Sequence, residues 1–371
     1  MLTVAILLFS LLYFYFFGYR YYAGRLDREV IQPDPKLKTP AETQYDGVDF
    51  VPGRPLVVFG HNFSAIAGAG PIIGPIVAMQ HFGWALTLVW ILLGNVFIGA
   101  VHDYITLMVS VRNRGSSIAD IAESTMGYRA KAIFAIFLLM ALILVIAVFG
   151  VVAAKTLIAQ PEMAFPTFAL IPWAMIFGWA IYHKNVNLTL GTTVAVAGLV
   201  FFLYLGFKLP VSLGQEGVLG LPPLMFWFVA LLIYTYFAAV LPVNILLQPR
   251  DYLSAFVLFG SMALGLAALF WVHPTLNTPA FLGGFSQEQG PVWPMLFVLV
   301  ACGAVSGFHS LVVGGTVSKQ LASESHGRII AYGGMLTEGV IAVMTVLLVG
   351  GGLYWAAPAV GNIDMATLGF R

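Results

Sequence analysis

Four side chains that could carry protons lie inside apolar stretches of this sequence. His61, Asp103, His309 and Glu338 each occur in a hydrophobic run long enough to cross a bilayer. Burying an ionisable group there costs about 2.5–3.5 kcal/mol on insertion scales, so each group needs a reason to be present. A carboxylate whose charge is disfavoured by burial can load and release a proton near neutral pH, and imidazole titrates in the physiological range. The residue types therefore indicate reversible proton transfer.

Each of the four also has a purely structural interpretation. Asp103, expected about 13 Å from the nearest charged loop, is either a proton carrier or a carboxylate held by backbone groups or by His102. Glu338 is a second candidate for proton coupling, but polar groups of a neighbouring helix could equally hold it in place. His61 could bind a substrate, relay a proton or simply fill the core. His309 is a third candidate for proton coupling, with close helix packing around it as the alternative.

The segment that must position His61 is unusual. Residues 60–75 carry four glycines and two prolines within an apolar run. Proline lacks the N–H that a helix interior needs, and glycine loosens the backbone, so we expect the span to break near mid-membrane. The N–H groups at the start of the second half-helix could then hold a substrate carboxylate at Gly68 and Gly70. The alternative is that both glycines only permit close helix packing.

Composition places the remaining chain in a membrane. Hydrophobic residues make up 60% and charged residues 9% of the sequence, whereas soluble domains carry about 25% charge. The net charge of +1 and the absence of a basic, aromatic-rich stripe argue against a nucleic-acid partner. At about 20 residues per span, the sequence predicts an all-α polytopic membrane protein with about ten transmembrane helices. The candidates are residues 2–22, 56–80, 84–110, 131–157, 166–182, 188–207, 222–247, 252–272, 292–315 and 329–355.

Basic residues predict the orientation. With the N-terminus extracytoplasmic, all of the 17 Lys and Arg residues except Lys155, Lys208 and Arg371 fall on the cytoplasmic side, as the positive-inside rule requires. Residues 1–22 then form a peripheral first helix, and residues 23–55 form a cytoplasmic loop.

A second irregular segment indicates an internal repeat. Pro242 and the polar Asn244 interrupt the predicted span 222–247, about half the protein after the first break. Two discontinuous helices at corresponding positions are typical of inverted-repeat transporters. The repeats would be residues 56–207, with five helices, and residues 222–355, with four helices seen, followed by an extracytoplasmic tail at 356–371. The alternative is that Pro242 only kinks a packed helix.

Several segments together resemble one known family. Residues 60–75, 99–104, 238–242, 249–253 and 301–309 look like the carbon starvation protein A family in order and spacing. The resemblance implies a multi-pass carrier of the bacterial or archaeal inner membrane, linked to carbon starvation and the stress response. Peptide uptake is the usual activity, with pyruvate uptake in a related branch. It also implies a fold similar to the amino acid–polyamine–organocation superfold, with two inverted five-helix repeats.

The sequence departs from the family pattern at several places. Asn62 stands where a second histidine is expected, and Asn244 stands where a tryptophan is common. Residues 311–318 offer fewer hydroxyl groups than the family pattern, which leaves fewer oxygens for an ion site. Two complete repeats after a peripheral helix need one more helix than the sequence shows. We therefore expect this chain to be a fragment of a longer protein that lacks its last helix.

These patterns predict a secondary active transporter, coupled to protons, that imports peptides by alternating access. A pyruvate or small monocarboxylate symporter of the same family is the alternative, and sodium coupling stays open. Tyr234, Tyr236, Asn62 and Asn244 are further candidate substrate contacts, and no cofactor or metal site is expected. An intramembrane hydrolase using Ser306 and His309 is the rival from another class, but no third catalytic group accompanies them. The expected partners are the solute, protons and lipid, and the sequence does not define the oligomeric state.

Overall fold

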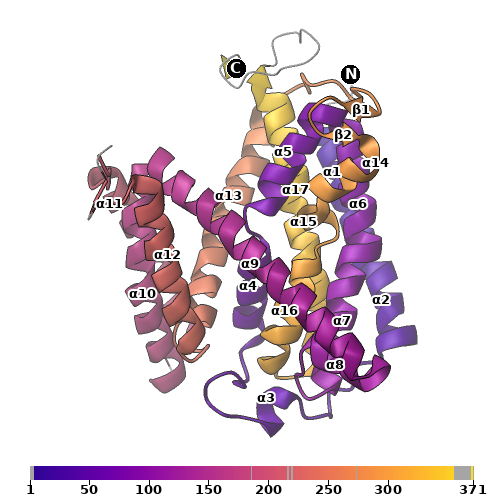
Figure 1. Cartoon of the computed structure of the whole chain (residues 1–371), viewed down its shortest axis with the longest axis vertical. Coiled ribbons are helices and arrows are strands. Elements are labelled where there is room, and N and C mark those ends of the chain that lie inside the picture. Colours follow the sequence, from indigo (N-terminus) through magenta and orange to yellow (C-terminus); the bar gives the residue numbers. More distant parts are fainter. Residues whose placement is uncertain are drawn as a thin grey trace.

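The computed structural model describes residues 4–184, 186–214, 217, 218, 220–272, 274–354, 369 and 370. These residues are largely helical, and their only sheets are two short antiparallel pairs (Figure 1). The pairs are β1 (Phe285–Ser286) with β2 (Gly290–Pro291), and β3 (Leu353–Tyr354) with β4 (Gly369–Phe370). Eight described helices are long and apolar enough to cross a membrane, and one bent pair would make a ninth. The prediction of an all-α polytopic membrane protein is confirmed.

The first span is longer than predicted. It joins α1 (Val4–Phe17), η1 (Gly18–Tyr22), α2 (Ala23–Leu26) and η2 (Asp27–Ile31) into 28 helical residues. Its charged end stays helical because Arg25 pairs with Glu29 one turn away, at 2.8 Å, and Asp27 pairs with Arg328 at 3.0 Å. The predicted loop 23–55 therefore begins only after Ile31, and it contains the short helix α3 (Pro40–Thr43).

The predicted break after His61 is confirmed. Helix α4 (Pro55–Ile66) ends before Ala67, and α5 (Gly70–Phe82) continues at an angle of 40°. Pro71 lies in the first turn of α5, where its missing N–H leaves no bond unmade. Gly83 then adopts a φ of +94°, and this conformation, which favours glycine, allows α6 to start at once.

The spans that follow agree closely with the sequence-based segments. Helices α6 and α7, joined by the π-helical turn η3, form one span, and the short α8 leads into α9, which runs obliquely toward α10–α12 in Figure 1. At 1.5 Å per residue, the 32 residues of α9 extend over about 48 Å. The bounds are α6 (Trp84–Gly94), η3 (Asn95–Gly99), α7 (Ala100–Arg112), α8 (Ile118–Met126), α9 (Tyr128–Ala159), η4 (Pro161–Met163), α10 (Ala164–His183) and α11 (Leu188–Lys208).

The second break was predicted in the wrong place. Helix α12 (Pro223–Val240) ends before Pro242, and residues 241–246 connect it to α13 (Leu247–Val272). Leu241 is extended, with a ψ of 147°, because the residue before a proline is driven out of the helical region. Pro242 and Asn244 therefore lie in a connection between two helices and do not divide a span.

The discontinuous segment of the second half is residues 292–315, which the sequence predicted as one span. It is divided into α14 (Val292–Leu299), α15 (Ala301–Ala304) and α16 (Gly307–Gly315). Val305 and Ser306 have extended backbone angles between α15 and α16. The chain then passes through η5 (Val317–Lys319), η6 (Glu324–His326) and η7 (Arg328–Tyr332) into α17 (Gly333–Gly352). That residues 56–207 and 222–355 are inverted repeats stays a prediction, and most of the predicted tail 356–371 lies outside the described residues.

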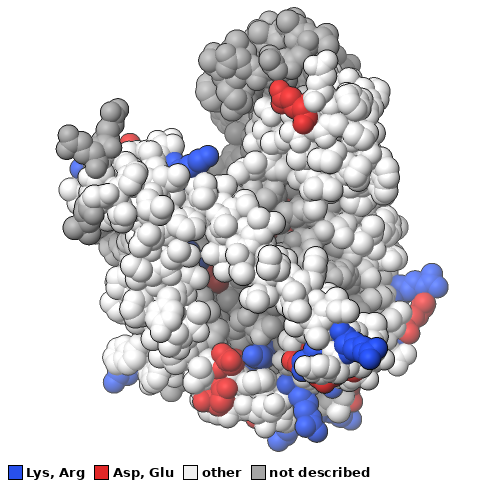
Figure 2. All heavy atoms as spheres, viewed as in Figure 1, with Lys and Arg blue, Asp and Glu red and all other residues white. Residues whose placement is uncertain are grey.

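The helices form two groups. The larger group surrounds the main hydrophobic core and includes α1, α5, α6, α7 and α17, while α10 and α11 pack with α13 around a smaller core. Helix α4 contacts both α13 and α17 and so links the groups. Figure 2 shows Lys and Arg gathered at the lower end, around α3 and α8, below a largely uncharged surface. Large apolar side chains on α9, such as Ile133 and Phe137, are more than 60% exposed, as suits a surface within a bilayer.

The two discontinuous segments cross each other. A Cβ atom added at Gly70 would lie 2.6 Å from Cys302 Cβ, and one added at Gly74 would lie 2.2 Å from the carbonyl oxygen of Leu299. At Gly68, by contrast, an added Cβ would meet nothing within 4 Å. Gly70 and Gly74 thus allow α5 to approach α14 and α15 closely, whereas Gly68 lies beside open space in the first break.

This difference predicts opposite outcomes for two single-methyl substitutions. Gly74→Ala should lower the thermal stability of the detergent-purified chain, by about 1–3 kcal/mol, because the backbone of α14 must shift away from the new methyl group. Gly68→Ala should leave stability unchanged or slightly raised. Thermal unfolding followed by circular dichroism measures both. Equal stability of the two variants would contradict the close crossing of the broken helices.

Candidate functional site

Asp103, His309 and Glu338 meet in the interior, and we call them the α7–α16–α17 cluster. His309 Nδ1 lies 3.2 Å from Asp103 Oδ2, and His309 Nε2 lies 3.4 Å from Glu338 Oε2. All three side chains are fully buried. One imidazole therefore lies between two carboxyl groups, with one ring nitrogen toward each of them.

This cluster has fewer hydrogen bonds than its polar atoms could make. Within the described part of the chain, Asp103 Oδ1 and Glu338 Oε2 are buried without a hydrogen-bond partner, although His102 Nδ1 lies 3.4 Å from Asp103 Oδ1. Two ionised carboxylates would exceed the charge that a single imidazolium can balance, and an uncompensated buried charge is costly. A proton bound within the cluster relieves that imbalance. The arrangement is therefore suited to holding and releasing a proton.

The surrounding helices explain why these residues meet. Asn95 begins the π-helical turn η3, and its Nδ2 donates to the carbonyl oxygens of Met335 (2.9 Å) and Gly303 (3.2 Å). These bonds tie the α6–α7 span to α17 and to α15. The break at Val305 and Ser306 starts α16 just before His309, which directs its side chain inward. Single π-helical turns inside α-helices are frequent at functional sites.

A thiol lies at the edge of the same cluster. Cys302 Sγ is 3.5 Å from Glu338 Oε1 and 3.9 Å from His309 Nε2. Donor atoms of Cys302, His309 and Glu338 all lie within 4.8 Å of one another, a spacing that could hold a divalent ion such as Zn²⁺. No metal ligands were expected from the sequence. Cys302 is 36 residues from Glu338, and the grouping arises only from helix packing.

A second polar cluster surrounds His61, and we call it the α4–α13 cluster. His61 Nδ1 lies 2.9 Å from Asp251 Oδ2, and Arg250 Nη1 donates to Asp251 Oδ1 at 2.8 Å. Behind them, Gln248 Nε2 donates to Gln320 Oε1 at 2.6 Å, and Gln320 Nε2 lies 3.5 Å from His61 Nε2. The Tyr182 hydroxyl donates to Gln248 Oε1. The burial of His61 agrees with the sequence analysis, but its acidic partner was not identified there.

The neighbouring residue of α4 faces the other way. Asn62 Nδ2 donates to the carbonyl oxygen of Ile330 at 2.8 Å, while no described residue forms a hydrogen bond with its buried Oδ1. An added Cβ at Gly334 would lie 2.7 Å from Asn62 Nδ2, so α17 approaches α4 closely at this point. Consecutive residues of α4 thus contact α13 on one side and η7–α17 on the other.

The remaining predicted substrate contacts are placed unequally. Tyr234 joins the α4–α13 cluster, since its ring centre lies 5.7 Å from Arg250 Cζ. Tyr236 is 66% exposed and packs against Phe237. Asn244 lies in the connection before α13, and its Oδ1 is buried with no hydrogen-bond partner among the residues that the structure describes. The structure therefore brings Tyr234, but not Tyr236, to a buried polar group.

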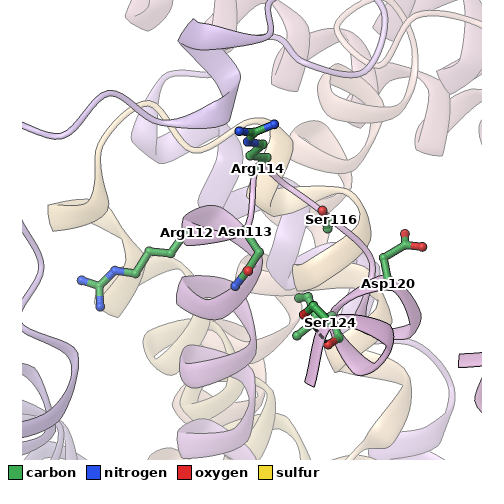
Figure 3. Close-up of a pocket in the computed structure, with 7 residues that line it drawn as sticks. Arg112, Asn113, Arg114, Ser116, Asp120 and Ser124 are labelled. Atoms are coloured by element: carbon green, nitrogen blue, oxygen red, sulfur yellow. Dashed lines mark hydrogen bonds between the residues drawn. The ribbon is translucent and has the colours of Figure 1, made fainter. Parts of the chain in front are cut away.

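A surface pocket of about 270 Å³ lies apart from both clusters, where α7 turns into α8 (Figure 3). In Figure 3, Arg112 points away from Asp120 and Ser124, and its Nη2 pairs with Glu324 at 2.9 Å. Asp120 pairs with Lys131, and this contact lowers the pKa of the Asp120 carboxyl group. Arg112 and Asp120 are thus engaged in local pairs. The full lining comprises Arg112, Asn113, Arg114, Ser116, Asp120, Ile121 and Ser124.

Comparison with known proteins identifies relatives along nearly the whole chain. A family model described as "Carbon starvation protein CstA" matches residues 3–362. The peptide transporter CstA of Escherichia coli K12 is 38% identical over 364 residues, which cover 95% of this chain and 51% of that protein. The pyruvate/proton symporter BtsT of the same organism is 36% identical over 381 residues, with coverages of 95% and 51%.

A more distant organism gives a similar result. The peptide transporter CstA of Campylobacter jejuni is 34% identical over 361 residues, which cover 92% of this chain and 50% of that protein. The chain spans about half the length of these curated relatives. No solved structure was found to match it.

Proposed function

The chain belongs to the carbon starvation protein CstA family, and on this basis we propose that it acts in a secondary active transporter that imports peptides by alternating access, coupled to protons. The observation that carries the proposal is the buried imidazole of His309 between Asp103 and Glu338, beside the crossing of two discontinuous helices. Discontinuous helices near the bilayer midplane are how many secondary transporters form a central site. The chain is a multi-pass membrane protein, so lipid surrounds it.

Asp103, His309 and Glu338 are proposed as the proton-coupling residues. A proton carrier must exchange its proton with only one side of the membrane at a time, so it is closed off from bulk water in between. Its charged form must then be stabilised by protein groups. His309 can pass a proton between the two carboxyl groups because its two ring nitrogens face them separately. This geometry supports proton coupling in preference to sodium coupling, because a sodium site would need several oxygen ligands around one point.

His61, Asn62, Gly68, Gly70, Tyr234, Tyr236 and Asn244 are proposed as substrate contacts. The open space beside Gly68, the unpartnered oxygens of Asn62 and Asn244, and the position of Tyr234 beside Arg250 support this assignment. Gly70 contributes through packing, and Tyr236 is the weakest member because its ring faces outward. Peptides are the proposed substrates because most of the named relatives are peptide transporters.

Pyruvate or another small monocarboxylate is the second candidate, because one relative of comparable similarity is a pyruvate/proton symporter. A hydrolase built on Ser306 and His309 is disfavoured by the geometry of that pair. Among the described residues, no hydrogen bond joins Ser306 to His309, and both His309 nitrogens face carboxyl groups. We therefore propose a transporter with no enzymatic activity and no required cofactor.

Uptake by reconstituted vesicles tests the transport function. Vesicles containing the full chain should accumulate labelled dialanine, or labelled pyruvate if the second candidate holds, when the outside is made acidic. An inward sodium gradient at constant pH should not drive accumulation. A metal chelator should leave uptake unchanged, since the cluster is proposed to carry protons. Failure of a folded chain to move either solute would contradict the proposal.

Asp103→Asn separates coupling from binding in the same vesicles. The amide has nearly the volume of a protonated carboxyl group but cannot release a proton. We expect the variant to exchange internal for external solute at a rate close to that of the unmodified chain, while a pH gradient no longer drives accumulation. Unchanged accumulation would exclude Asp103 as a coupling residue. Loss of exchange together with accumulation would assign it a structural role.

The proposed location is the inner membrane of a bacterium or archaeon, with the N-terminus extracytoplasmic. Ser116, at the α7–α8 turn, and Gln287, in the β1–β2 hairpin, belong to opposite ends of the molecule in Figure 1. A cysteine at Ser116 should react with an impermeant maleimide only from the cytoplasmic side, and one at Gln287 only from outside. The unmodified chain controls for Cys302. The reverse labelling pattern would overturn the orientation.

A further inference from the structure

Most of the hydrogen-bonding capacity of Arg250 is free. For comparison, Arg112 donates two hydrogen bonds to Glu324, from Nε to Oε1 at 3.1 Å and from Nη2 to Oε2 at 2.9 Å. Among the described residues, Arg250 makes a single hydrogen bond, from Nη1 to Asp251 Oδ1, and its side chain is 35% exposed. A guanidinium group carries five N–H donors in a planar fork. One edge of this fork is therefore available to a second anion.

The guanidinium group is nevertheless held in position. Arg250 and Asp251 lie in the first turns of α13, and the ring of Tyr234, on α12, packs over Arg250 with its centre 5.7 Å from Cζ. A ring on one face of a guanidinium group restricts its plane and leaves the edge of the fork unobstructed. Such preorganisation reduces the entropy lost when an anion binds.

Asp251 has a second partner that does not depend on Arg250. Its Oδ2 lies 2.9 Å from His61 Nδ1, and its side chain is only 7% exposed. If another anion took the place of Asp251 at the guanidinium group, His61 would still satisfy this carboxylate. A buried carboxylate with no other partner could not release its arginine at so low a cost. Another anion can therefore replace Asp251 as the partner of Arg250.

We propose that Arg250 binds the carboxylate group of the transported solute, and that Asp251 occupies the guanidinium group while the site is empty. The inference rests on the proposed transport function and narrows its substrate class to solutes with a free carboxylate. A carboxylate fits the guanidinium fork through two parallel hydrogen bonds. The C-terminus of a peptide and a small monocarboxylate such as pyruvate share this chemistry. When the solute binds, its carboxylate pairs with Arg250, and Asp251 remains hydrogen-bonded to His61.

Equilibrium binding to the detergent-purified full chain tests the inference. Dialanine is compared with dialanine amide, and pyruvate with pyruvamide, by scintillation proximity or by competition. The acid that binds should do so about tenfold more tightly than its amide, because the amide cannot accept the charge-assisted pair of hydrogen bonds. Which acid binds distinguishes the peptide from the monocarboxylate. Equal affinity for acid and amide would overturn the inference.

Two substitutions in the cluster should act in opposite directions. Arg250→Gln should abolish the preference for the acid over the amide. Asp251→Asn should retain the preference and tighten acid binding several-fold, because the competing carboxylate is gone. A purely structural ion pair would instead weaken binding in both variants. The double variant Arg250→Gln, Asp251→Asn restores charge balance, and it should bind acid and amide equally even if Arg250→Gln alone is unstable.

Arg328 supplies a matched control. It pairs with Asp27 at 3.0 Å, lies 5.1 Å from the ring centre of Tyr19 and has a side-chain exposure of 32%, all similar to Arg250. No buried histidine holds Asp27 among its described contacts. Arg328→Gln should keep the preference for the acid unchanged, and its loss in this variant would contradict a specific role for Arg250.

Different results would contradict the transport function and the role of Arg250 in carboxylate binding. Selective binding of an acid that vesicles do not transport would sustain the role of Arg250 and contradict the transport function. Transport of acid and amide at equal rates and affinities would sustain transport and contradict the role of Arg250. Binding of neither acid by a folded chain would overturn the inference as well.

Discussion

The cost of placing charge in a bilayer governs this structure. Asp103 and Glu338 are fully buried carboxyl groups in largely apolar spans, and both lie beside His309. Asp251 pairs with His61 and also with Arg250. A histidine can compensate a buried carboxylate when protonated, or accept and donate hydrogen bonds when neutral. Pairing with histidine stabilises Asp103 and Glu338 inside the membrane, and the proposed coupling requires that they can still change charge. A lysine or arginine in place of His309 would fix that charge.

The helix breaks follow from the same constraint. Buried acids need partners from several helices, and these helices must approach closely to bring them together. Gly70 and Gly74 let α5 contact the segments α14 and α15, and the break at Ser306 starts α16 just before His309. The resulting crossing leaves open space beside Gly68 and an unpartnered oxygen on Asn62. Both features are expected of a site where backbone and side chains receive a solute.

The sequence revealed the acids and histidines more readily than their partners. His61, Asp103, His309 and Glu338 stood out because each interrupts an apolar run, and all four are buried. Asp251 was overlooked because it lies at the start of a helix, where a charged residue looks like the end of a span. The first break was predicted from its glycines and prolines. The second break lies at Val305 and Ser306, which carry no such signal, whereas Pro242 gave a strong signal and merely ended α12.

The central proposal is that solute entry is coupled to protons carried by Asp103, His309 and Glu338. Its most direct test is the pH inside reconstituted vesicles, reported by a trapped dye while valinomycin and potassium hold the membrane potential at zero. Adding the transported acid outside, at equal pH on both sides, should acidify the interior as the solute enters. Solute entry without any change of internal pH would contradict proton coupling.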